Sequence, residues 1–199
     1  MMLNDKEIKK RIIEDDLIII PHYLYCDAPE KYDASIQPCS YDLTLSKSFK
    51  RIKKQNCVYP NKTYVDLCEP IEYVDVPYDS EAYSGVVIGA GEFLLGASRE
   101  IVTLPKDIGA MLITRSSLGR AGLMLTIANW IDPGYVGTIS MQIFNASPNP
   151  VLLTEKLRVA QLVFFKLGEA CEHPYYGKYI HQDSATGSRI FKDPETHRQ

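Results

Sequence analysis

The sequence has no long apolar run, few histidines and no closely spaced pair of cysteines. A membrane-spanning helix needs about 20 consecutive apolar residues, and neither such a stretch nor the apolar core of a secretory signal is present. The four histidines and five scattered cysteines do not show the spacing of zinc ligands. We therefore expect a cytoplasmic protein with reduced thiols and no metal site made of its own side chains.

An excess of positive charge is also missing. The 22 lysines and arginines face 25 aspartates and glutamates, which gives a formal net charge of −3. Because a general nucleic-acid binder has a basic face, we expect no nucleic-acid partner. We interpret the lysine-rich stretch 47–63 as a solvated edge that discourages strand pairing. The acidic, tyrosine-rich stretch 64–85 is interpreted as a surface hairpin.

The sequence does contain many short β-rich runs separated by glycine and proline. They lie at 17–20, 37–45, 86–88, 93–96, 100–104, 108–113, 138–145 and 158–164. Such a series is typical of a closed, mostly antiparallel barrel. We predict a mostly β protein with a distorted antiparallel β-barrel or jelly-roll fold. With 199 residues and 45% hydrophobic residues, the chain is expected to form a single domain over 1–199.

Two local patterns make this prediction more specific. Asn4 followed by Glu7 fits a capping box, which predicts one short N-terminal helix at about 5–14. In the run 138–145, apolar and polar residues alternate. This alternation predicts one face with Ile139, Met141 and Ile143, and an opposite face with Ser140, Gln142 and Phe144.

Two arginines and two serines lie close together in Arg115-Ser116-Ser117-Leu118-Gly119-Arg120. Guanidinium groups, hydroxyls and backbone N–H groups at a turn are the donors that bind anions. A lone carboxylate, Asp132, follows in apolar surroundings, and Pro133-Gly134 then turns the chain. This order predicts a nucleoside phosphate site. A polar hairpin turn with a solvated arginine pair is the alternative.

These segments resemble motifs of the dCTP deaminase/dUTPase superfamily, and the chain is closest to the deaminase or bifunctional deaminase–dUTPase branch. The run Arg115–Leu123 is similar to the phosphate motif, and Ile131–Gly137 is similar to the motif that follows it. Further similar segments are Pro38–Leu43, Glu100–Pro105, Arg158–Leu162 and the deaminase-type tail Pro174–Asp193. The resemblance implies a dUTPase-like fold, homotrimers with sites between subunits, and a nucleotide bound as its Mg²⁺ triphosphate complex.

The resemblance also implies roles for individual residues. The triphosphate would be held by Arg115, Ser116, Ser117 and Arg120. Asp132 would contact the deoxyribose 3′-hydroxyl and, as in dUTPases, orient the attacking water. Tyr135 would close the sugar pocket against a 2′-hydroxyl. Phosphate or base would be contacted from the tail by Tyr175, Lys178 and Gln182.

At one position the chain departs from the deaminase pattern. The catalytic residue of the deaminases is a glutamate, and the alignment of Thr138–Asn145 places Gln142 there. Deamination at C4 needs a group that takes a proton from water and passes it on. An amide does not titrate in the working range. Compared with typical deaminases, the chain is also one residue shorter between Gly122 and Asp132, so that Ala128-Asn129-Trp130 would present a different base pocket.

Hydrolysis of a phosphoanhydride makes no such demand on Gln142. It needs a triphosphate held by positive charge, a magnesium ion that spreads the developing charge, and an oriented water. Arg115, Ser116, Arg120 and Asp132 could meet these needs. From the sequence we therefore predict a dUTPase-like hydrolase that forms dUMP and pyrophosphate, with Asp132 in the catalytic centre and Gln142 reading the pyrimidine edge. The alternatives are a dCTP deaminase, alone or bifunctional, and a non-catalytic nucleotide-binding regulatory module.

Overall fold

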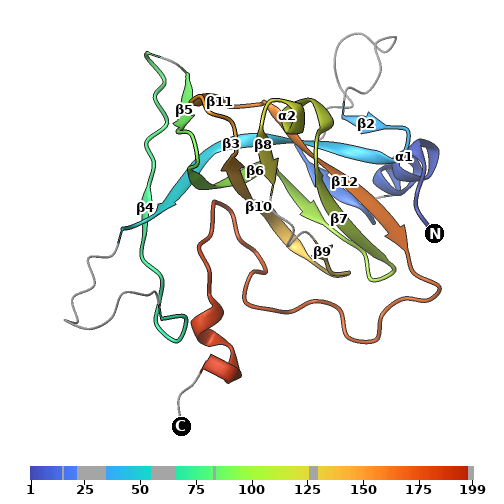
Figure 1. The fold of residues 1–199 in the computed structure, drawn as a ribbon. Coiled ribbons are helices and arrows are strands. Elements are labelled where there is room, and N and C mark those ends of the chain that lie inside the picture. Colours follow the sequence, from blue (N-terminus) through green and yellow to red (C-terminus); the bar gives the residue numbers. More distant parts are fainter. Residues whose placement is uncertain (15, 22–34, 55–65, 83, 126–129, 197–199) are drawn as a thin grey trace.

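Strand β3 (Ser40–Ile52) is the central element of the sheet on which the protein is built (Figure 1). The computed structural model describes residues 1–14, 16–21, 35–54, 66–82, 84–125 and 130–196. The other strands are β1 (Ile18–Ile20), β2 (Ile36–Gln37), β4 (Tyr73–Asp75), β5 (Gly85–Ile88), β6 (Phe93–Thr103), β7 (Ile108–Thr114), β8 (Leu123–Leu125), β9 (Trp130–Ile131), β10 (Val136–Asn145), β11 (Val151–Thr154) and β12 (Arg158–Lys166).

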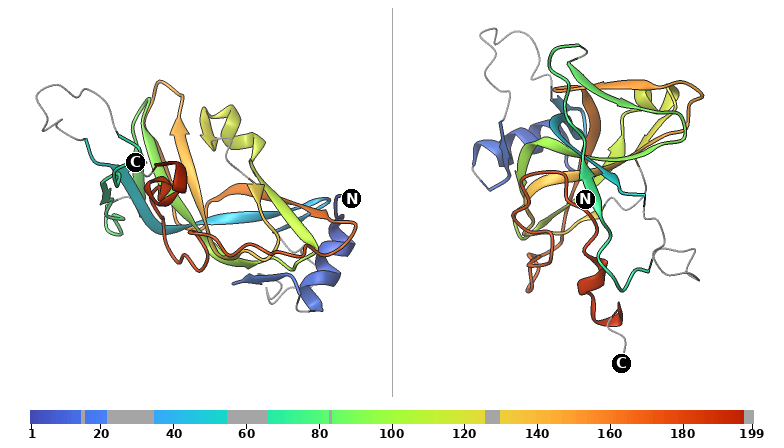
Figure 2. Two further views of the ribbon diagram at one scale, coloured as in Figure 1. Left: turned by 90° about the horizontal axis from the view of Figure 1, so that it is seen from below. Right: turned by 90° about the vertical axis from the view of Figure 1, so that its left-hand side faces the viewer.

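The large sheet is curled and antiparallel. Its strand order is β8-β10-β6-β3-β12-β7-β9, with β1 added to β6 and both β2 and β4 added to β3. Strands β5 and β11 form a separate two-stranded sheet. The prediction of a mostly β, distorted antiparallel barrel is confirmed, and Figure 2 shows the curl of the sheet in two further views.

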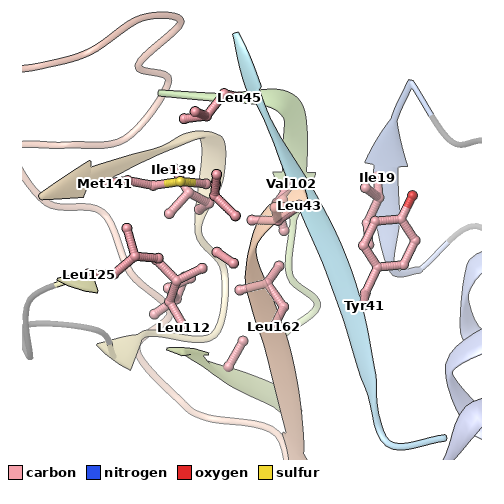
Figure 3. Packing of buried hydrophobic residues seen from close by; sticks show 14 of the residues in the cluster. Ile19, Tyr41, Leu43, Leu45, Val102, Leu112, Leu125, Ile139, Met141 and Leu162 are labelled. Carbon is pink, nitrogen blue, oxygen red and sulfur yellow. The ribbon is translucent and has the colours of Figure 1, made fainter. Parts of the chain in front are cut away.

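The core lies inside this curl. Tyr41, Leu43 and Leu45 of β3 are fully buried, and they pack near residues from β1, β6 and β12 (Figure 3). The opposite face of β3 is covered as well, because Asp42 and Thr44 are also buried. A buried carboxylate on a central strand needs partners within the protein, and those of Asp42 bear on the candidate site.

The N-terminal helix α1 (Asp5–Ile13) confirms the capping-box prediction. The Asn4 side chain accepts a hydrogen bond from the Glu7 N–H (3.0 Å), and the Glu7 carboxylate accepts one from the Asn4 N–H (3.1 Å). Arg11 of this helix forms an ion pair with Asp107 at 2.7 Å, which attaches the helix to the start of β7. No helix within the described ranges is long and apolar enough to cross a membrane.

The lysine-rich and acidic stretches pair with each other. Strand β4, from the acidic stretch, is antiparallel to the end of β3, with Ile52 opposite Tyr73. Lys50 contacts Asp75 at 2.5 Å, and Lys53 contacts Glu72 at 2.6 Å. The interpretation of 47–63 as a solvated edge that discourages strand pairing is therefore wrong for residues 49–52, which pair with β6 or β4. The interpretation of 64–85 as a surface hairpin is wrong for β4, which pairs with β3. Residues 55–65 lie outside the described part of the chain.

The chain after β12 forms a long C-terminal segment that follows the lower side of the sheet in Figure 1. It contains no strand in its described part and ends in two short 3₁₀ helices, η1 (Ile190–Lys192) and η2 (Pro194–Thr196). A bridge between Gly137 and Gln182 joins it to the start of β10. This path places the tail beside the polar face of β10.

Candidate functional site

A cavity of about 490 Å³ lies between the polar face of β10 and the C-terminal segment. Among the predicted site residues, those that line it are Asp132, Tyr135, Gln142, Tyr175 and Gln182. The structure thus brings together side chains from the turn after β9, from β10 and from the tail. The remaining candidates, in the phosphate motif and at Lys178, are not among its lining residues.

Asp132 lies in a tight turn between β9 and β10. Gly134 has φ +86°, a conformation that favours glycine, and a Cβ there would stand only 2.5 Å from Pro174 Cβ. The indole N–H of Trp130 donates to Asp132 Oδ1 at 2.9 Å. Within the described lining of the cavity, Asp132 is the single carboxylate. The turn therefore supplies this cavity with one oriented carboxylate.

Tyr135 and Gln182, which both line the cavity, form a hydrogen-bonded pair. The Gln182 amide donates to Tyr135 Oη (2.8 Å) and to the Thr138 carbonyl (2.7 Å), and the Tyr135 hydroxyl also donates to that carbonyl (2.6 Å). Burial raises the pKa of Tyr135 well above its ordinary value, so the phenol stays protonated. Among the described residues, the buried Gln182 Oε1 has no hydrogen-bond partner.

Gln142 lies in the middle of β10, opposite Leu95 of β6. The alternation predicted for this strand is confirmed, because Ile139, Met141 and Ile143 are buried whereas Gln142 is only half-buried. Its side chain lines the cavity together with that of Ser140. Gln142 is therefore in a position to contact a bound base, with a group that can both donate and accept a hydrogen bond.

The phosphate motif forms the short helix α2 (Ser116–Arg120), where a turn was expected. Ser116, Ser117 and Arg120 are exposed on it. Figure 1 shows α2 near the top of the molecule, beside β8, and the C-terminal segment along the lower side; both views of Figure 2 also keep them apart. Within one protomer, the phosphate motif and the cavity are thus two separate surfaces.

Arg115 points towards the protein. Its Nε lies 3.3 Å from Asp42 Oδ2, and its guanidinium also donates to the Arg158 carbonyl at 3.3 Å. Asp42 is fully buried and also contacts Arg158 (3.2 Å) and the Gln161 amide (3.1 Å). Burial raises the pKa of this carboxyl, and the charge of Arg115 acts in the opposite direction. Arg115 therefore fixes the start of α2 to β3 and β12.

Sequence reasoning gave Asp42 no role in the site. Its only signal was a carboxylate within the β-rich run 37–45, and its partners Arg115 and Arg158 lie far away in the sequence. Lys178, by contrast, was predicted to contact the nucleotide, and the structure pairs its ammonium with the carboxylate of Asp193 in the same tail. This hydrogen bond raises the pKa of Lys178. The predicted contact with phosphate or base stays a prediction.

Comparison with known proteins gives matches over nearly the whole chain. The family model described as dCTP deaminase-like matches residues 2–167. The "dCTP deaminase, dUMP-forming" of Persephonella marina is 35% identical over 98% of this chain and 100% of its own length. The protein of the same name from Dictyoglomus thermophilum is 36% identical over 96% of this chain and 95% of its own.

A solved structure agrees with the fold. The 2′-deoxycytidine 5′-triphosphate deaminase of Agrobacterium tumefaciens matches with a TM-score of 0.57 and 22% identity, over 82% of this chain and 47% of that one. The names of the relatives contradict the dUTPase-like function predicted from Gln142 and favour the deaminase alternative. The amide at position 142 does not outweigh a similarity that runs through nearly the whole chain. This protein belongs to the dCTP deaminase-like family.

Proposed function

We propose that this protein deaminates dCTP and forms dUMP, releasing ammonia and pyrophosphate. The observation that carries the proposal is that Asp132, Tyr135, Gln142 and Gln182 all line the same cavity. In a bound pyrimidine nucleotide, the sugar would contact the turn with Asp132 and the base would contact Gln142 of β10. The C-terminal segment with Gln182 would cover both. The relatives named as dUMP-forming deaminases, similar over almost the full length, support the same activity.

The proposed chemistry has two hydrolytic steps. In the first, water adds to C4 of cytosine and ammonia leaves, which gives dUTP. In the second, water attacks the α-phosphorus, which gives dUMP and pyrophosphate. Because the amide of Gln142 cannot take up a proton at neutral pH, we assign proton transfer from water to Asp132, the one carboxylate in the described lining. Gln142 would hold the base edge or the water by hydrogen bonds.

Magnesium enters this proposal with the nucleotide. Within the described residues, no group of three or more histidine, cysteine, aspartate or glutamate side chains is placed to hold a metal ion. The donor set fits a Mg²⁺ ion that is bound mainly by triphosphate oxygens and water. Such an ion would spread the charge that develops on the phosphates. On the protein side, the exposed Ser116, Ser117 and Arg120 would bind the phosphate oxygens.

The separation of α2 from the cavity leads us to propose a homo-oligomer, a trimer by the family resemblance. A nucleotide in the cavity of one protomer would meet the phosphate motif of a neighbouring copy. Asp42 and Arg158 would then serve to orient Arg115 and α2 towards that neighbour. Each active site would contain residues from more than one chain.

Sites shared between subunits predict complementation between two inactive variants. Arg120→Ala removes a phosphate ligand, and Asp132→Asn removes the proton acceptor from the cavity. When the two variants are co-expressed in equal amounts, half of the chains carry an intact cavity and half carry an intact phosphate motif. With random assembly, about a quarter of the sites combine an intact cavity with an intact phosphate motif, so about a quarter of the wild-type activity should return. Activity of the mixed oligomers, with subunit composition checked by native mass spectrometry, is the measurement. Mixed oligomers that stay inactive would contradict a shared site.

The activity itself is tested with purified protein, Mg²⁺ and either dCTP or dUTP. Nucleotides are separated by chromatography, and ammonia and pyrophosphate are measured in parallel. We expect dUMP, ammonia and pyrophosphate from dCTP in equal amounts. Pyrophosphate from dUTP without any ammonia from dCTP would overturn the proposal, and so would binding of dCTP without any product.

A further inference from the structure

The wall of the cavity includes Tyr73 of β4, a residue from the acidic stretch for which the sequence suggested no role. Directly beside Tyr73 lie residues 184–188 of the C-terminal segment, which we call the roof. Gln142 lines the same cavity. The position of Tyr73 relative to the roof indicates what this strand does.

Three strands hold the roof through side-chain acceptors. The Ala185 N–H donates to Ser48 Oγ of β3 (3.0 Å), and the Thr186 N–H donates to Ser140 Oγ of β10 (3.1 Å). The Ser188 N–H donates to the hydroxyl of Tyr73 (3.0 Å). Ala185 is fully buried in a small apolar cluster against which the Tyr73 ring also packs. Backbone donors that the tail could not pair by itself are thus satisfied by the sheet.

Between these contacts, Gly187 rests directly on the tyrosine ring. A Cβ at this position would overlap with Cε2 and Cδ2 of Tyr73. Because no φ constraint applies to Gly187, the need for glycine here comes from the close approach of the backbone to the ring. The ring and the hydroxyl of Tyr73 therefore contact two successive residues of the roof.

The strand that carries Tyr73 is itself fixed in place. It pairs with the end of β3, and the ion pairs Lys50–Asp75 and Lys53–Glu72 flank Tyr73 along the β3–β4 pairing. Ile52, directly opposite Tyr73, also lines the cavity. The lysine-rich end of β3 and the acidic β4 thus form a strand pair that contributes Ile52 and Tyr73 to the cavity wall.

We propose that Tyr73 is a positioning residue that holds the roof over the part of the cavity lined by Gln142, and that it thereby sets the affinity for the nucleotide. The identity of that nucleotide rests on the proposed function, whereas the contact between Tyr73 and the roof does not. Tyr73 acts through the roof and takes no part in proton transfer. Its loss should therefore change binding far more than the chemical step.

The first experiment measures the roof without any nucleotide. Amide hydrogen exchange of 184–188 is compared in the wild type, Tyr73→Phe and Tyr73→Ala, with the tail variant Tyr176→Ala as control, since Tyr176 is 88% exposed. We expect exchange at Ser188 to be about tenfold faster in Tyr73→Phe, which loses only the hydroxyl, and faster still in Tyr73→Ala. Unchanged exchange in both variants, or equal acceleration in Tyr176→Ala, would overturn the proposal.

The second experiment is a double-mutant cycle with Gly187→Ala. Alone, this substitution should disturb the roof because the new methyl group meets the ring. In the Tyr73→Ala background the space of the ring is free, so Gly187→Ala should change KM by less than about twofold. With dCTP as substrate, Tyr73→Ala and Gly187→Ala are each expected to raise KM about tenfold or more and to leave kcat within about twofold. Additive effects, or losses confined to kcat, would overturn the positioning role.

Failure of the two proposals can be told apart. If the wild type does not act on dCTP, the proposed function fails, and the exchange data still decide whether Tyr73 holds the roof. If dCTP is turned over and Ser188 exchanges at the wild-type rate in Tyr73→Ala, only the role of Tyr73 fails.

Discussion

Replacing Gln142 with glutamate is expected to raise the rate of ammonia release from dCTP by about 10²-fold or more, because a positioned general acid–base group typically contributes that much. The side chain already lines the cavity, on the polar face of a well-paired strand. Glutamate has nearly the same shape as glutamine, so the substitution adds an ionisable group with little change in packing. The measurement is the initial rate of ammonia formation at saturating dCTP.

Two comparisons give this result its meaning. Gln142→Met keeps the volume and removes the hydrogen bonds, and it should lower turnover below that of the wild type if the amide orients the base or the water. Phe144→Tyr changes another residue on the same face of β10, outside the described cavity lining, and should leave the rate unchanged. If Gln142→Glu releases ammonia no faster than the wild type, Asp132 already meets the whole demand for proton transfer.

The parts of the fold and of the site that follow from short stretches of sequence were predictable. Asn4 and Glu7 specify the start of α1 because a capping box is made within four residues. The alternation in β10 places Gln142 on the cavity face because the side-chain period of a strand is fixed. Likewise, Pro133-Gly134 positions Asp132 because the turn needs the positive φ that Gly134 adopts.

The parts that depend on distant partners could not be predicted in this way. Asp42 contacts Arg115 and Arg158 only after three strands have come together. Tyr73 acquires its role from Gly187 and Ser188, more than a hundred positions later in the chain. A lysine run and an acidic run each look solvated when considered alone, yet here they pair across β3 and β4. No local pattern distinguishes such partners from an ordinary surface.

Replacing Asp132 with asparagine is expected to lower the release of ammonia and of pyrophosphate by about 10²- to 10⁴-fold. Asparagine has the same shape, and its side-chain oxygen can still accept the hydrogen bond from the Trp130 indole. The turn and the cavity should therefore persist, and dCTP affinity, measured by calorimetry with Mg²⁺, should stay within about threefold of the wild type. What is lost is the capacity of the group to take up a proton.

A matched control separates this effect from a general loss of negative charge near the tail. Asp183 is an exposed carboxylate next to Gln182 in the sequence and does not line the cavity, so Asp183→Asn should retain wild-type turnover. Three results then distinguish the possible roles of Asp132. Loss of turnover with retained affinity supports proton transfer, whereas loss of both makes Asp132 mainly a ligand for the sugar. An Asp132→Asn variant that keeps more than about a tenth of the activity would show that another group accepts the proton, since a neutral amide cannot replace a general base.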